Sequence, residues 1–118
     1  MVSMTTHQQH IRLHYIDDMR ASYDKDVATA ERTLVFDGDM PVKGERAGLD
    51  DLHLCEVAFS QFNRHDAPDQ HPALDELGFR SLSVGDAVEI VEPGNSRFYL
   101  CASFGFEPIE GCRSKVTS

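Results

Sequence analysis

The sequence of 118 residues contains no Trp and only three Cys. No stretch approaches the roughly 20 apolar residues that a membrane-spanning helix needs, so the sequence predicts no such helix. The N-terminal residues have neither a cationic start nor an apolar stretch, and we therefore expect no signal peptide and a cytoplasmic protein. The cysteines are Cys55, Cys101 and Cys112, with no C-x-x-C pair. We interpret Cys55 and Cys101 as small apolar core residues and Cys112 as an exposed one.

Basic residues are also scarce, because 11 Lys and Arg stand against 20 Asp and Glu, for a formal net charge of −9. A field of that sign repels phosphate backbones and disfavours direct nucleic-acid binding. The charge has two interpretations. It can simply keep a small domain soluble, or it can form an acidic surface that occupies the nucleic-acid groove of another protein.

Motifs for catalysis, metals and phosphate are missing as well. The sequence has no H-E-x-x-H pair, no Cys/His cluster, no G-x-S-x-G elbow and no Walker pattern. His10 and His14 would share one face of a strand, but about 13 Å would separate them at roughly 3.3 Å per residue. That is too far for one metal, and we interpret both as solvent-facing. We predict no catalytic residues, no metal and no cofactor.

Two segments in the first half are typical of strands. His10–Ile16 alternates, with Ile11, Leu13 and Tyr15 on its apolar face. Thr33–Phe36 is a short β-branched and aromatic run, and it predicts a second strand. Asp37-Gly38-Asp39 follows directly. Because Asp-Gly is a strong turn pair, we expect the second strand to end there.

The clearest helix is predicted over Asp51–Asn63, with Asp50 as its N-cap. The spacing of Leu52, Cys55, Phe59 and Phe62 places these four on one helical face, which we expect to be buried. On that basis Phe59→Ala is expected to cost about 3–5 kcal/mol. A short second helix is predicted over Pro72–Leu77, ended by Gly78.

The second half predicts a β-hairpin. Val88 and Ile90 alternate with Glu89, and Pro93-Gly94-Asn95 provides a reversal. The returning strand Arg97–Ser103 is apolar on both sides, so we expect it to be central in a sheet. Gly105 suggests a bulge or a close backbone approach. The tail from Gly111 is expected to fray.

These elements predict one α+β domain over residues 1–118. The expected fold is a small antiparallel sheet of four to five strands, with the main helix packed on one face and a short second helix.

Six polar residues surround the predicted hairpin strands, and they are the only candidate site. They have two interpretations: an interaction edge near the strand ends, or turn and cap groups that satisfy loop amides. They are Arg80, Ser81, Ser83, Asp86, Ser103 and Glu107.

The predicted main helix ends in Phe62-Asn63. It is followed by the strand entry Arg80-Ser-Leu-Ser-Val-Gly-Asp86 and by the return Tyr99-Leu-Cys-Ala-Ser-Phe-Gly-Phe106, and we call the stretch Phe79–Glu107 that contains both the signature. With these features, Leu49–Glu107 resembles the YodL-like domain of phage and mobile-element proteins. The resemblance leaves the N-terminal half uncovered. Separately, the polar residues 111–118 are expected to form a flexible tail.

The resemblance implies an accessory protein of a phage or mobile element, and it offers no catalytic residues. We expect it to bind an unidentified host protein in the host cytoplasm, as a monomer or homodimer, and to inhibit a defence or nucleic-acid-handling system. The alternatives are a small hydrolase or nucleotide-modifying enzyme with a spatially assembled site, and a purely structural or oligomerisation module.

Overall fold

The computed structural model describes residues 6–17, 30–43, 50–63, 70–78, 80–111 and 114–116. Its elements are β1 (Thr6–Ile16), β2 (Arg32–Lys43), α1 (Asp51–Gln61), α2 (Ala73–Glu76), β3 (Ala87–Glu92), β4 (Asn95–Ala102), β5 (Gly105–Ile109) and β6 (Ser114–Val116). In the described part of the chain, neither helix is long and apolar enough to cross a membrane.

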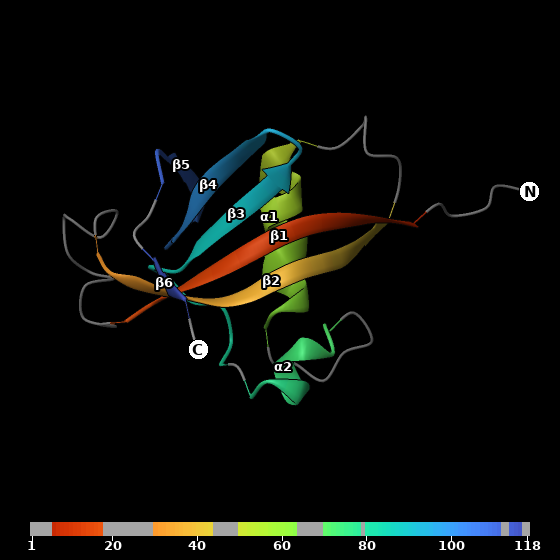
Figure 1. Ribbon diagram of the computed structural model, residues 1–118, viewed down its shortest axis with the longest axis horizontal. Helices are drawn as coiled ribbons and strands as arrows, with labels where there is room; N and C mark the ends of the chain where they lie inside the picture. The colour runs from red at the N-terminus through yellow and green to blue at the C-terminus, as the bar shows by residue number, and fades with distance from the viewer. Residues whose placement is uncertain are drawn as a thin grey trace, which may run out of the picture.

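The strands form one sheet in the order β5-β4-β3-β1-β2-β6. Strands β1 to β5 pair antiparallel with one another, as expected, whereas β6 is parallel to Arg32–Leu34 of β2. Figure 1 shows β4, β3, β1 and β2 in this order, with α1 crossing behind them. The expectation of a frayed tail is wrong for Ser114–Val116, because the first residues of β2 offer backbone groups with which a strand can pair.

The predicted turn at Asp37-Gly38-Asp39 is also wrong, since β2 continues through it to Lys43. Opposite it, β1 pairs residue by residue, with His10 facing Asp39 and Arg12 facing Asp37. Gly38 has another reason to be small. A Cβ placed there would lie 3.0 Å from the Phe36 ring, so glycine lets that ring fold back over the strand. Continuous pairing with β1 therefore outweighs the local turn preference of Asp-Gly.

Pro41 lies inside β2, although proline cannot donate to a strand ladder. The strand tolerates it because β6 pairs only with Arg32–Leu34. At Pro41, β1 is the only strand neighbour in the described part of the chain. The missing N–H therefore falls at a sheet edge.

Side chains of β1, β2, β3, α1, α2 and the loop before β3 form one buried cluster. Its fully or nearly fully buried members are Ile11, Leu13, Tyr15, Met40, Val42, Leu54, Cys55, Ala58, Phe62, Ala73, Leu74, Leu82, Val88 and Ile90. Cys101 is buried as well, so the interpretation of both Cys55 and Cys101 as core residues is confirmed.

The predicted buried face of α1 is half wrong. Cys55 and Phe62 are fully buried, but Leu52 is 49% exposed and Phe59 is 38% exposed. Phe59 instead meets Phe106 of β5 edge to face, with ring centroids 6.3 Å apart. The face of α1 that contacts the cluster carries Leu54, Cys55 and Ala58 instead of Leu52 and Phe59. The expected cost of Phe59→Ala is therefore too high.

The predicted hairpin is confirmed, with Pro93-Gly94 between β3 and β4 and a positive φ of 73° at Gly94. Strand β4 lies between β3 and β5, which confirms its central place. The proposed bulge at Gly105 is wrong. This glycine has a φ of 91° and opens β5 after a turn at Ser103-Phe104. A Cβ there would meet nothing within 4 Å, so the backbone angle, and not crowding, favours glycine.

The predicted helix ends are largely confirmed. Asp50 caps α1, since its carboxylate accepts a hydrogen bond from the His53 backbone N–H at 2.8 Å. The short second helix is present as α2, and Gly78 follows it with a φ of 68°.

Candidate functional site

Four of the six predicted polar residues form one cluster just before β3, in which Arg80, Ser81 and Ser83 surround Asp86. Asp86 is fully buried. Its carboxylate accepts two hydrogen bonds of 2.7 Å from the Arg80 guanidinium, one of 2.9 Å from Ile16 N and one of 2.8 Å from Ser83 N. Ser81 joins through its carbonyl, which accepts from Arg80 and from the Ser83 hydroxyl. Asp86 thus ties the end of β1 to the loop that leads into β3.

Arg80 is held on its other side by Tyr15 of β1. The guanidinium carbon lies 4.2 Å from the centre of the Tyr15 ring, and the Tyr15 hydroxyl donates to the Arg80 carbonyl at 2.9 Å. The hydrogen bonds to Asp86 raise the pKa of Arg80. The Asp86 carbonyl also accepts from Cys101 N at 2.8 Å, which brings in β4. We call Arg80, Ser81, Ser83 and Asp86 the Asp86 junction. Its polar side chains form hydrogen bonds within the protein and so serve the fold.

The other two predicted residues lie outside this junction. Ser103 and Glu107 are exposed on the β4–β5 hairpin, at its turn and on β5 respectively. Between them stands Phe104, whose side chain is 99% exposed. Sequence reasoning missed Phe104, because an aromatic residue within the largely apolar stretch Phe98–Phe106 looks like a core residue. We call Ser103, Phe104 and Glu107 the hairpin tip.

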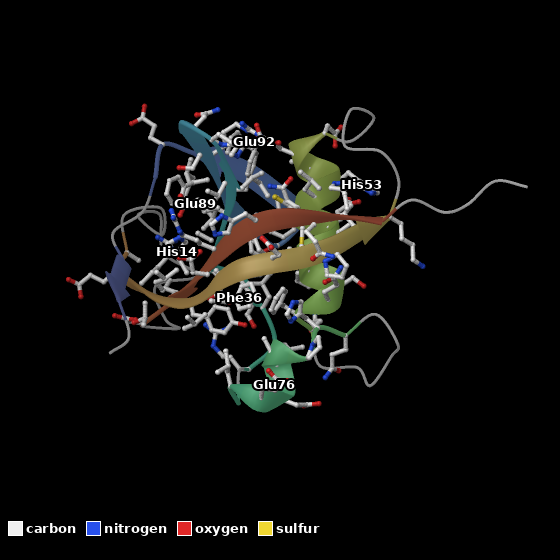
Figure 2. All side chains as sticks on the ribbon, turned by 45° about the vertical axis from the view of Figure 1, so that its right-hand side comes forward. His14, Phe36, His53, Glu76, Glu89 and Glu92 are labelled. Atoms are coloured by element: carbon white, nitrogen blue, oxygen red, sulfur yellow. The ribbon has the colours of Figure 1, made fainter. Side chains whose placement is uncertain are left out.

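A second polar network crosses the sheet between β1 and β3. The Glu89 side chain is only 4% exposed, and it lies 3.0 Å from both Arg12 Nη1 and His14 Nε2. Figure 2 shows His14 and Glu89 together on the sheet. The Phe98 ring covers His14 at 5.6 Å. Burial lowers the pKa of His14. The expectation that His14 faces solvent is therefore wrong, because Glu89 and Phe98 enclose it.

The same network continues to β2. Arg12 lies 3.4 Å from Asp37, and His10 Nε2 hydrogen-bonds the same carboxylate. The hydrogen bond from His10 holds the pKa of Asp37 below its ordinary value. Within the described residues, no group of three or more His, Cys, Asp or Glu is arranged to hold a metal ion. Each acid of this row instead faces a basic side chain, as cross-strand pairs do in sheets.

A third polar cluster joins the start of α1 to β4. The Asp51 carboxylate accepts from Arg97 Nε, from Arg97 Nη2 at 2.9 Å and from the Tyr99 hydroxyl at 2.5 Å. Burial, with the Asp51 hydrogen bond second, raises the pKa of Tyr99 to about 12. Tyr99 is thus a neutral donor at neutral pH, and the cluster anchors the helix.

A cavity of about 740 Å³ lies between the end of β2, α1 and the segment before α2. Its lining residues are Pro41, Lys43, His53, Val57, Ser60, Gln61, Gln70, His71 and Pro72. Figure 2 shows His53 on α1, on the side of the end of β2. Gln61 is 6% exposed, and its amide nitrogen donates to the Pro41 carbonyl at 2.6 Å. Its amide oxygen is buried and has no hydrogen-bond partner among the residues that the structure describes.

His71 also contacts this stretch of β2, through the Asp39 carbonyl. Its Nδ1 accepts from Ala73 N at 3.0 Å, so its proton is on Nε2, which donates to the Asp39 carbonyl at 3.1 Å. The ring stacks on Phe62 at 4.6 Å. Together, Gln61 and His71 hydrogen-bond the carbonyls of Pro41 and Asp39, in the stretch of β2 that pairs with β1 on one side. Two side chains thus cover this edge of the sheet.

A family model for the YodL-like domain matches residues 2–111. The chain belongs to the YodL-like domain family. No curated protein and no solved structure matches this chain. The family match is longer than the resemblance over Leu49–Glu107 had indicated, and it includes β1 and β2.

This longer match agrees with the contacts of the YodL-like signature. Asp86, in the first half of the signature, accepts from Ile16 at the end of β1. Arg80 rests on Tyr15 of the same strand. The signature residues therefore need β1 to complete their hydrogen bonds, and β1 belongs to the same structural unit as the signature.

Proposed function

We propose that this YodL-like protein is an accessory protein of a phage or mobile element that acts by binding a host protein in the host cytoplasm, and that it is not an enzyme. The observation that carries the proposal is Phe104, 99% exposed on a hairpin turn. Exposed aromatic side chains are enriched at protein interfaces, where they supply much of the binding energy.

The two edges of the sheet support this proposal by their contrast. At the β2 edge, the carbonyls of Asp39 and Pro41 already accept from His71 and Gln61. Strand β5 is the terminal strand at the other edge and pairs with β4. Its hairpin carries Phe104. A partner therefore finds a covered edge on one side and an aromatic side chain on the other.

Charge supports the same proposal, because the chain has a formal net charge of −9. Acidic surfaces steer basic partners toward them and speed association. Proteins that handle nucleic acids have basic grooves, so a defence or nucleic-acid-handling enzyme of the host fits this charge. We propose inhibition of such an enzyme as the consequence of binding.

Affinity purification of the tagged protein from host lysate tests the proposal. We expect a stoichiometric host partner that elutes with increasing salt, since electrostatic steering is screened. Retention of no protein above background at low salt contradicts it. A tagged domain of similar size and charge serves as the control for ion-exchange effects.

The cavity beside α1 favours a second candidate function, the binding of a small molecule. A buried acceptor without a partner, such as Gln61 Oε1, costs about 1–3 kcal/mol, which a ligand with an N–H donor could recover. Cavities of this size suit small ligands. Indole and 1-methylindole form a matched probe pair. Chemical shift changes of Val57 and Gln61 with indole alone support this function, and equal responses to both probes contradict it.

A further inference from the structure

We propose that Phe104 is the anchor of the interface, and that its partner presents an apolar pocket rimmed by Lys and Arg side chains. This inference rests on the proposed function, since it names the contact through which the host protein is held.

Among the large apolar side chains of the described residues, Phe104 is the most exposed. Leu52 is 49% exposed, Phe59 is 38% exposed and Leu77 is 58% exposed, so each retains a partly covered surface, whereas Phe104 is 99% exposed. An aromatic side chain of this kind buries roughly 150–250 Å² when it enters a pocket. Nearly all of that area is available to a partner at Phe104.

The hairpin presents Phe104 on a short and well-supported turn. Ala102 pairs with Gly105, so only Ser103 and Phe104 lie between the paired residues. One step down the ladder, the buried Cys101 pairs with Phe106. A short turn on a paired stem restricts the backbone before binding, which lowers the entropy that a partner must remove.

The base of the same hairpin is fixed to the rest of the fold. The Phe106 ring meets Phe59 of α1 edge to face at 6.3 Å. On the other side of the stem, the Cys101 carbonyl accepts from Gly85 N at 2.9 Å, next to the Asp86 junction. The hairpin tip therefore projects from an anchored stem.

The charge around Phe104 determines what the rim of the pocket must carry. Glu107, on β5 two residues after Gly105, is the first charged residue beyond the turn, and no basic residue occurs from Phe98 to Gly111. Glu107 is exposed. Basic groups around the partner's pocket would pair with it, and carboxylates there would repel it. A hydrophobic pocket rimmed by Lys and Arg is thus the complementary surface.

The first test compares Phe104→Ala with Leu77→Ala, a matched truncation of another exposed apolar residue on α2's C-terminal side. With the partner captured by the wild-type protein, Phe104→Ala should weaken the measured affinity at least tenfold and Leu77→Ala less than twofold. Equal affinities for the wild-type and Phe104→Ala proteins overturn the anchor while leaving the proposed function standing. If the wild-type protein captures nothing, the proposed function itself fails.

The second test identifies the pocket. The photoreactive phenylalanine analogue p-benzoylphenylalanine replaces Phe104 in one protein and Leu77 in a control, and each is irradiated in host lysate. We expect one discrete crosslinked host protein from position 104 only, with Lys or Arg side chains around the crosslinked residue in its sequence or structure. An acidic surrounding overturns the pocket chemistry. A crosslink to a second copy of this chain overturns a host partner at this surface.

The third test addresses the rim. Glu107→Lys should slow association about threefold or more, whereas Glu76→Lys on α2, with the same change in net charge, should leave the rate within about twofold. Figure 2 labels Glu76, which is exposed on α2. Faster association of the Glu107→Lys protein would mean that the pocket is rimmed by acids and would refute the proposed chemistry.

Discussion

The Asp86 junction and the hairpin tip carry polar residues from the two halves of one sequence signature, but their environments are opposite. Asp86 is fully buried and accepts four hydrogen bonds from Arg80, Ile16 and Ser83. At the hairpin tip, Ser103 and Glu107 are exposed beside Phe104. Only the first set is used to hold the fold together. A shared signature can therefore combine a structural half and an exposed half that is available to a partner.

The largest expected effect is the loss of the Asp86 carboxylate. Asp86→Ala leaves two backbone N–H groups and the Arg80 guanidinium without their acceptor, so unfolding free energy should fall by about 3–5 kcal/mol. Chemical denaturation at pH 7 measures this. Asp86→Asn keeps one acceptor oxygen and should show an intermediate loss. A loss below about 1 kcal/mol for Asp86→Ala would mean that the junction contributes little stability.

The two phenylalanines of the α1 region extend the comparison between buried and exposed sites. Phe62 is fully buried and its ring lies 4.9 Å from that of Phe36. Phe62→Ala should therefore cost about 3–5 kcal/mol. Phe59→Ala, at a site that is 38% exposed, should cost only about 1 kcal/mol. Thermal melts of both variants provide the test. Equal shifts in melting temperature for the two variants would mean that Phe59 is as buried as Phe62, as the sequence predicted.

Local patterns predicted those parts of the fold in which neighbouring residues decide the outcome. Alternation found the buried face of β1, and the Pro93-Gly94 turn located the hairpin. The Asp50 cap marked the start of α1. In each of these cases the determining groups lie within a few residues of one another. Propensity and tertiary structure agree there.

The failures arise where distant segments decide. Asp37-Gly38-Asp39 remains in a strand because it pairs with β1. The two segments are distant in sequence, since 27 positions separate His10 from Asp37, which it hydrogen-bonds. The alternation of Glu89 with Val88 and Ile90 is typical of a strand with one solvent-facing side, yet His14 and Arg12 of β1 contact Glu89, which is buried. Burial of the Asp86 carboxylate depends on Ile16. None of these partners can be read from the adjacent sequence.

A smaller effect concerns pH at His14. Burial lowers its folded-state pKa below the ordinary value of 6.5. As pH falls through that value, the unfolded chain takes up a proton before the folded protein does, so stability is lost on acidification and retained above it. His14→Gln keeps an N–H donor for Glu89 and removes the titration. Denaturation midpoints between pH 7.5 and 5 should therefore fall less in the variant than in the wild-type protein. Parallel slopes would assign the pH dependence to other groups.

The smallest expected effect on stability lies at the hairpin tip. Phe104 is 99% exposed, so Phe104→Ala removes almost no buried area and should change unfolding free energy by less than about 0.5 kcal/mol. Glu107→Ala should behave alike. Denaturation of both beside Asp86→Ala gives the measurement, and a loss above about 1 kcal/mol would place Phe104 in the folded core. Unchanged stability has a further consequence. Any loss of partner binding in Phe104→Ala then reports on the interface alone, which separates the exposed half of the signature from the half that holds the fold.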